Sequence, residues 1–261
     1  MAYEKLKVEQ DGKVVILTLN DPASLNAASN EVVADFVDAI GRIASGEIAC
    51  RAIVITGEGR GFCSGANLAG RGPGGGTGDA GERLEAVFNP LMRKMRDLAV
   101  PIVTAVNGPA AGVGCSLALM GDIVVCAESG YFLQAFGRIG LVPDGGSTWM
   151  LPRMIGKARA MEMMLLAEKI PAAQALDWGL VNRVVPDADL MSTAIALAKK
   201  LADGPASIGM IRKLVWQSLD LDHTGALDAE RWTQKDAGST ADFAEGVKAF
   251  LEKRPAQFTG A

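Results

Sequence analysis

Three short apolar segments constrain the fold of this chain more than any other feature of its sequence. AIVITG (52–57), PIVTAVNG (101–108) and DIVVCAE (122–128) are rich in β-branched residues and almost continuously apolar. Such runs are typical of strands buried on both faces. Because stretches with helical spacing lie between them, the alternation predicts βα-type units and an α/β fold whose sheet is covered by helices on both sides.

Further elements are expected on either side of these segments. VVILTLN (14–20) has the composition of a strand, and Ser29 is a good N-cap for a helix whose apolar residues recur at helical spacing up to Ile43. From Gly156 onward the pattern is mainly helical. The remaining expected helices span 82–98, 158–169, 189–203, 205–219 and 240–254.

Composition and charge exclude several classes of protein. The 261 residues carry a formal net charge of −4 and are 49% hydrophobic, which argues against a nucleic-acid surface and fits a globular protein. The charged N-terminus does not resemble a secretory signal, and no apolar run approaches the ~20 residues that span a bilayer. The four cysteines lack metal-site spacing. We therefore expect reduced thiols in a cytoplasmic protein that binds neither membranes nor nucleic acid.

The chain contains a single histidine, His223, in a polar stretch where a solvent-facing side chain is expected. A Ser-His-Asp or Cys-His catalytic group would have to use it. A zinc site with two histidines is impossible within one chain. The sequence gives no indication of a bound metal.

A glycine-rich segment, GRGPGGGTGDAG (70–81), is expected to be a flexible surface loop. It lacks the Gly-Lys-Ser/Thr that ends a phosphate-binding P-loop, and no strand leads directly into it.

One carboxylate, Asp144, lies between a proline and two glycines in GLVPDGGSTW (140–149). From the residues alone it has two interpretations. Pro-Asp-Gly is ordinary turn chemistry, and an aspartate shortly before a helix can cap free backbone N–H groups. The alternative is a catalytic base.

Five motifs, which follow one another in order over nearly the whole chain, resemble the enoyl-CoA hydratase/isomerase family, the crotonases. They are GRGFCSGANLAG (59–70), PIVTAVNGPAAGVGCSLALMGDIVVCAE (101–128), GRIGLVPDGGSTWMLPRMIG (137–156), AQALDWGLVNRVVP (173–186) and DFAEGVKAFLEKRPAQF (242–258). The resemblance implies a ClpP/crotonase-like spiral of ββα units over residues 1–200, which holds the CoA-thioester site. It also implies a helical region over 201–261 that forms homotrimers, often paired into hexamers.

The resemblance also implies a chemistry. Members of this family act on acyl-CoA thioesters, and removing a proton beside the carbonyl creates an enolate oxygen that needs pre-aimed donors. By resemblance these donors are the backbone N–H groups of Ala66 and Val113. Gly65 and Gly112 beside them allow the chain to turn closely around the thioester.

Residues expected by resemblance to bind the CoA thioester are Ala66, Asn67, Leu68, Ala69, Val113 and Phe136. Arg60 is a candidate contact for a CoA phosphate. Coenzyme A enters as part of the substrate, and no separate cofactor is implied.

The resemblance also indicates a reaction, because branches of the family differ in which active-site positions carry a carboxylate. Hydratases of the family use two glutamates because the two parts of water go to adjacent carbons. This chain aligns Ser116 and Phe136 with those glutamates. Asp144 aligns with the only acid of the isomerase branch, and one carboxylate suffices to move a proton from the alpha to the gamma carbon. An apolar surround of Phe136, Leu141, Val142 and Trp149 is expected to raise the pKa of Asp144.

The favoured function is therefore a double-bond or ring-epoxide isomerase of fatty-acid or phenylacetate catabolism. A hydratase is an alternative if Asp79, Glu82 or Glu85, which follow the glycine-rich segment, reach into the site. A non-catalytic acyl-CoA binder is an alternative of another class.

Overall fold

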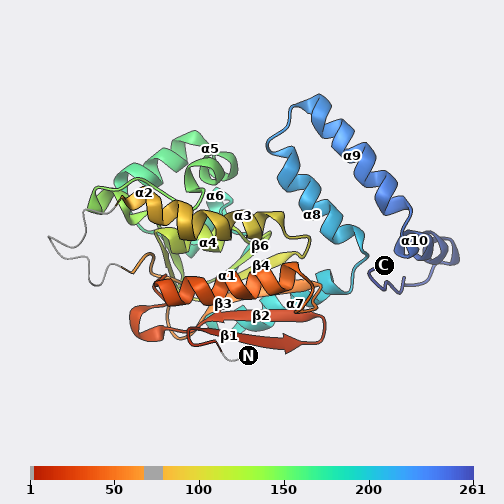
Figure 1. The fold of residues 1–261 in the computed structure, drawn as a ribbon, viewed down its shortest axis with the longest axis horizontal. Helices are drawn as coiled ribbons and strands as arrows, with labels where there is room; N and C mark the ends of the chain where they lie inside the picture. Colours follow the sequence, from red (N-terminus) through yellow and green to blue (C-terminus); the bar gives the residue numbers. More distant parts are fainter. Residues whose placement is uncertain (1–2, 68–78) are drawn as a thin grey trace.

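A six-stranded sheet forms the centre of the molecule in the computed structural model, which describes residues 3–67 and 79–261 (Figure 1). Its order is β1-β2-β3-β4-β6-β9. The β1–β2 pair is antiparallel and the other pairs are parallel. The strands are β1 (Leu6–Asp11), β2 (Val14–Leu19), β3 (Ala52–Gly57), β4 (Ile102–Val106), β6 (Ile123–Ala127) and β9 (Arg183–Val185). The predicted strands are confirmed, whereas β1 and β9 were not predicted.

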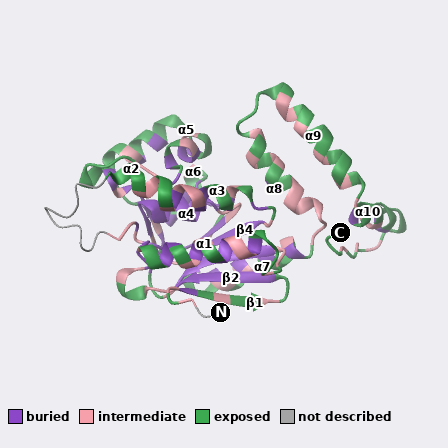
Figure 2. Ribbon diagram, viewed as in Figure 1, coloured by how far each residue is buried: buried purple, intermediate pink, exposed green. Residues whose placement is uncertain are grey.

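Helices cover both faces of this sheet, as expected for strands whose residues are all buried, such as β2 and β3 (Figure 2). One face packs against α7 (Leu190–Ala202), whose alanines at 194, 198 and 202 allow close approach. The opposite face packs against α1 (Asn30–Ala44), α3 (Asn89–Asp97) and α4 (Val113–Leu119).

The helix starts follow the capping chemistry of the sequence. The Ser29 hydroxyl accepts a hydrogen bond from the Val32 N–H at 3.2 Å and caps α1, as predicted. The helix expected over 82–98 begins earlier, at α2 (Ala80–Arg83), because the Asp79 carboxylate caps it. A π-helical turn (Leu84–Phe88) joins α2 to α3.

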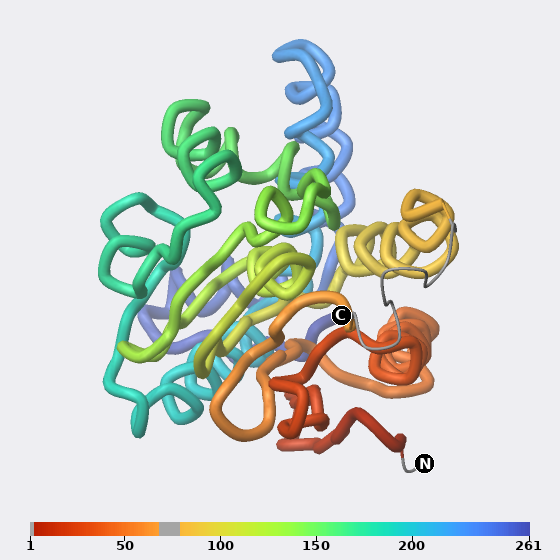
Figure 3. The backbone as a smooth tube through the Cα atoms, turned by 90° about the vertical axis from the view of Figure 1, so that its left-hand side faces the viewer, coloured from red at the N-terminus to blue at the C-terminus, as the bar shows by residue number. Residues whose placement is uncertain are grey.

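A second, three-stranded sheet consists of β5 (Pro109–Ala111), β7 (Tyr131–Leu133) and β8 (Ile170–Pro171). Cys63 pairs in parallel with Ala110, and β5 pairs in parallel with β7. Successive segments of the chain therefore run side by side in one direction, as turns of a spiral (Figure 3). In the chain, α5 (Ser147–Leu166) lies between β7 and β8, and α6 (Ala172–Trp178) follows β8.

Helix α5 is longer than the segment predicted over 158–169. It begins at Ser147 and contains Pro152 and a kink at Gly156, where φ is +77°. Both residue types disfavour a helix interior, so the sequence concealed its first half.

Three helices, α8 (Ser207–Ser218), α9 (His223–Gly238) and α10 (Ala241–Glu252), project from the core (Figure 1). The buried Arg212 guanidinium anchors α8, donating to the Asp122 carboxylate at 2.6 Å and to the Met95 carbonyl at 2.8 Å. Helix α9 was not predicted, and His223, its first residue, is exposed as expected.

The boundary predicted between 200 and 201 lies within α7, and the division into two regions stays a prediction. Across the described ranges, the helices are too short or too polar to cross a bilayer.

Candidate functional site

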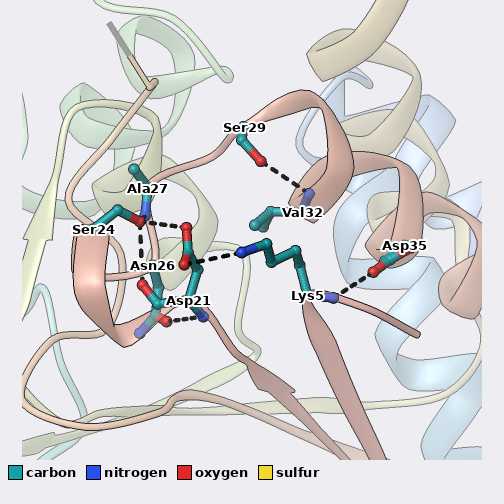
Figure 4. Close-up of polar contacts among 8 residues, drawn as sticks. All are labelled: Lys5, Asp21, Ser24, Asn26, Ala27, Ser29, Val32 and Asp35. Carbon is teal, nitrogen blue, oxygen red and sulfur yellow. Dashed lines mark hydrogen bonds and ion pairs between the residues drawn. The ribbon is translucent and has the colours of Figure 1, made fainter. Parts of the chain in front are cut away.

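The loop before α1 lies beside the segment that carries Ala66, and hydrogen bonds join its polar side chains to one another and to neighbouring backbone groups (Figure 4). The buried Asn26 side chain accepts a hydrogen bond from the Asp21 N–H at 2.8 Å. The Asp21 carboxylate accepts one from the Ser24 hydroxyl at 2.7 Å and pairs with Lys5 at 3.2 Å. These contacts fix the loop in a conformation that presents Ala28 to the next segment of the chain.

Ala66 lies on that next segment. The Ala28 N–H donates to the Gly65 carbonyl at 2.7 Å, and the Ala28 carbonyl accepts from the Asn67 N–H at 3.4 Å. Because neighbouring backbone groups of an extended chain point in opposite directions, the N–H of Ala66 points away from Ala28. The predicted binding residues Leu68 and Ala69 lie outside the described residues.

Val113 lies on an adjacent segment. Gly65 has φ of +102°, and a Cβ there would come within 2.9 Å of the Ala111 carbonyl oxygen and 3.7 Å of the Gly112 Cα. Gly112, at φ +53°, precedes Val113, the first residue of α4. The Val113 N–H therefore has no intrahelical acceptor. Both glycines have a positive φ, and they bring the segments that carry Ala66 and Val113 together. Their predicted role around a thioester stays a prediction.

The two positions aligned with the hydratase glutamates are both buried. Ser116 lies one turn after Val113 on α4 and is completely buried. The Phe136 ring lies 3.7 Å from where a Cβ at Gly112 would be, so it covers the turn before α4. Neither position offers a group that could exchange protons with a substrate carbon without a further partner.

Asp144 lies in the turn before α5, and its carboxylate is half-buried. Its Oδ1 atom is buried and accepts no hydrogen bond from any residue that the structure describes. Burial raises the pKa of Asp144 from 3.8 to about 6. The carboxylate does not cap α5, because the N-cap residue is Gly146 and no side chain bonds there. The capping interpretation of Asp144 is therefore wrong.

The predicted apolar surround of Asp144 is wrong in part. Leu141 and Val142 are 43% and 78% exposed, so neither is part of a buried apolar surround. The Trp149 ring instead stacks on Trp216 of α8, with a centroid separation of 6.2 Å, and lies under the Arg153 guanidinium.

Shielding of the Asp144 turn comes from helices that sequence reasoning did not implicate. A Cβ at Gly145 would lie 2.7 Å from the Ser116 Cβ on α4 and 3.3 Å from the Met92 methyl group on α3. The turn therefore packs directly against both helices, which removes it from water.

The three acids that a hydratase could use, Asp79, Glu82 and Glu85, either bond to their own neighbours or are exposed to solvent. Asp79 caps α2 through the Gly81 N–H at 2.7 Å. Glu85 pairs with Arg93 at 3.1 Å, and that hydrogen bond lowers the pKa of Glu85. Glu82 is exposed, as is Arg60, the candidate phosphate contact.

A small apolar cavity of about 20 Å³ lies beside the segment that carries Val113. It lies between α1, the π-helical turn, α3 and α4, next to Ala28, Cys63 and Val113. Phe88, Leu91 and Met92 contribute to its wall. The residues that line it are all apolar, and its volume is near the minimum that holds one water molecule.

Comparisons with known proteins identify one family, both by sequence and by structure. A sequence profile described as enoyl-CoA hydratase/isomerase matches residues 9–261. The chain is 43% identical to the 1,2-epoxyphenylacetyl-CoA isomerase of Escherichia coli (strain K12), over 95% of each chain. It is also 43% identical, over 100% of each chain, to a "probable enoyl-CoA hydratase" of Rhodobacter capsulatus. A crystal structure of enoyl-CoA hydratase from Mycobacterium smegmatis superposes with a TM-score of 0.91 at 30% identity, covering 97% of this chain and 98% of that one.

Proposed function

Because this chain belongs to the enoyl-CoA hydratase/isomerase family and has the crotonase fold, we propose that it is an enoyl-CoA isomerase with Asp144 as its single acid–base group. The observation that carries the proposal is the Asp144 carboxylate itself. Its Oδ1 is buried and accepts no hydrogen bond from the described residues, while Ser116 and Phe136, which the family resemblance aligns with the hydratase glutamates, are buried and carry no carboxylate.

The proposed reaction moves one proton. The Asp144 carboxylate removes the proton from the alpha carbon of a 3-enoyl thioester, and the electron pair of that C–H bond shifts into an enolate. The double bond then moves towards the carbonyl as Asp144 returns the proton to the gamma carbon. The enolate oxygen accepts hydrogen bonds from the Ala66 and Val113 N–H groups; loss of one such donor typically costs ~10²–10³ in rate.

The raised pKa of Asp144 suits this role. A carboxyl with a pKa of about 6 is still mainly ionised at neutral pH, yet it binds a proton more strongly than an ordinary aspartate. It can therefore act as a base in the first half of the reaction and as an acid in the second.

Hydration of a 2-enoyl-CoA is the second candidate, because the Rhodobacter capsulatus relative is named as a probable hydratase at the same identity as the named isomerase. Hydration needs a second acid–base group besides Asp144. The contacts of Asp79 and Glu85 with their own neighbours count against either residue in that role.

The proposed substrate is an acyl-CoA, with the thioester contacted by Ala66, Asn67, Leu68, Ala69, Val113 and Phe136. We propose no separate metal or redox cofactor. The name of the Escherichia coli relative makes ring-epoxide thioesters of phenylacetate catabolism a substrate class to include. Exposed apolar side chains on α10, such as Phe250 and Leu251 at 82% and 74% exposure, favour a homotrimer or hexamer. A cytoplasmic location is part of the same proposal.

The experiment that tests the reaction gives purified protein a 3-enoyl-CoA, a 2-enoyl-CoA and a ring-epoxide CoA ester in separate assays. Products are separated by retention time and mass. Conversion without change of mass supports isomerisation, whereas a product heavier by one water supports the hydratase. Tight CoA-ester binding with no product from any substrate would support the binder.

A further inference from the structure

A chain of hydrogen bonds runs through the buried space behind Asp144. The Ser116 hydroxyl lies 2.9 Å from the backbone carbonyl of Asp144 and 2.6 Å from the Ser147 hydroxyl. The Gln134 side-chain nitrogen lies 2.9 Å from that same Ser147 hydroxyl. Ser116, Ser147 and Gln134 are all completely buried. No step of the proposed reaction uses them.

The hydrogen bonds between Gln134, Ser147, Ser116 and Asp144 all run in one direction, because each hydroxyl has a single proton to donate. A carbonyl only accepts, so the single Ser116 proton goes to the Asp144 carbonyl. The Ser147 proton must then go to the Ser116 oxygen, since Ser116 has none left to give. The Ser147 oxygen in turn accepts from the Gln134 amide. Hydrogen bonds aligned in this way polarise one another in a dry interior, which strengthens the final bond to Asp144.

The backbone carbonyl of Asp144 thus accepts hydrogen bonds from two donors, whereas Oδ1 of its carboxylate has none among the described residues. The second of these donors is the Ser147 N–H at 3.1 Å, so both lone pairs of the carbonyl oxygen are used. Gly145, at φ +59°, brings the turn against the Ser116 Cβ. In contrast, Oδ1 of the same residue accepts no hydrogen bond from the described residues.

We propose that Ser116, backed by Ser147 and Gln134, is a positioning residue that fixes the Asp144 turn through its main chain and so keeps the carboxylate clear of hydrogen-bond donors. A carboxylate held by donors to its own oxygens would be a weaker base. Anchoring the backbone instead immobilises the group without that penalty. The positioning role for catalysis rests on the function proposed above, whereas the anchoring of the turn does not.

The test begins with the substrate-free, full-length protein. Hydrogen–deuterium exchange, read by mass spectrometry, is compared for wild type, Ser116→Ala and Ser147→Ala. Thr56→Val is the matched control, because Thr56 also donates from a buried hydroxyl to a carbonyl, that of Ala105 at 2.8 Å, but within the sheet. Ser116→Ala should speed exchange in the peptide covering 143–149 by about two- to tenfold, the usual value of one hydrogen bond. Ser147→Ala should do so less, and Thr56→Val not at all.

Activity supplies the second readout. Ser116→Ala should lower kcat with KM nearly unchanged, and should move the acidic limb of the kcat–pH profile to lower pH, as the freed carboxylate reaches water or donors. Unchanged exchange over 143–149 in Ser116→Ala would overturn the inference, even with an active isomerase. A lower kcat in Ser116→Ala with a pH profile that matches that of wild type and Thr56→Val would also overturn it. If the wild type is inactive on every enoyl-CoA, the proposed function fails, and the exchange data still decide whether the turn is anchored. If Ser116→Ala does not fold, the Ser147→Ala comparison decides in the same way.

Discussion

Gly145 and Ser116 pack so closely that a Cβ atom on Gly145 would lie 2.7 Å from the Ser116 Cβ. The contact joins the turn that carries Asp144 to α4, the helix whose first residue is Val113. The proposed base and one proposed oxyanion donor are therefore fixed relative to each other by a short, rigid path. Mutations at this contact should affect catalysis more than they affect folding.

Gly145→Ala tests that contact. The added methyl group meets Ser116 and also strains a residue at φ +59°, so we expect a stability loss of about 1 to 3 kcal/mol and a large fall in kcat. Gly12→Ala is the matched control, because Gly12 has φ +60° with nothing within 4 Å. It should cost about 1 kcal/mol and leave kcat unchanged. Chemical denaturation and steady-state kinetics measure both, and equal kinetic effects in the two variants would count against the contact.

Gly65→Ala tests the approach of the Ala66 and Val113 segments. A methyl group at Gly65 would come within 2.9 Å of the Ala111 carbonyl oxygen, so it should push the two segments apart. Misaimed donors should lower kcat by ~10²–10³. Gly46→Ala serves as the control, since Gly46 has φ +80° in open space. A Gly65→Ala enzyme with normal kcat would show that these segments do not support the reaction.

Protein stability should report the ionisation of Asp144. Its pKa is about 6 in the folded protein against 3.8 as the ordinary value, so the fold binds the proton more tightly than the unfolded chain does. Stability from that proton is fully present below pH 3.8 and is lost as the pH rises to about 6. Asp144→Asn, which stays neutral, should therefore be more stable than wild type by about 1 to 2 kcal/mol at pH 8. Urea unfolding between pH 4 and 8 measures the difference, which should shrink towards pH 4; a constant difference would contradict the raised pKa.

The cysteines should be poorly reactive in the folded protein. All four are free thiols, and burial raises the pKa of Cys63 to about 11 and that of Cys115 to about 12. Since the thiolate is the reactive form, alkylation at pH 8 should be slow, with the half-buried Cys50 first. In denaturant all four should react quickly. Peptide mapping would contradict this expectation if Cys63 were labelled rapidly in native protein.

The sequence predicted the strands of the parallel core because their composition, almost continuously apolar and rich in β-branched residues, is typical of buried strands. Continuous apolar runs rich in β-branched residues, such as 52–57, are typical of strands buried on both faces of a sheet, and β3 is buried along its whole length. Strand β1 and helix α9 escaped prediction for the opposite reason. Their residues are largely exposed, and polar sequences carry little periodic signal.

The candidate site was predicted unevenly. Gly65 and Gly112, the glycines before Ala66 and Val113, were identified through the family resemblance, and the structure gives both a positive φ, which glycine adopts at low cost. The shielding of Asp144 was misjudged, because sequence neighbours such as Val142 point to solvent while Met92, fifty-two positions earlier, packs beside the turn. The Gln134–Ser147–Ser116 chain had no sequence signal, since three polar residues at unrelated spacings indicate nothing until the fold brings them together.

The central claim is that Asp144 alone moves the proton, and Asp144→Asn tests it most directly. The variant is compared with wild type on a 3-enoyl-CoA, while a CoA-ester binding assay checks that the site is intact. Our account predicts conversion to the 2-enoyl ester by wild type and near-complete loss of turnover in Asp144→Asn, with binding retained. Near-normal turnover in the Asn variant would contradict the account.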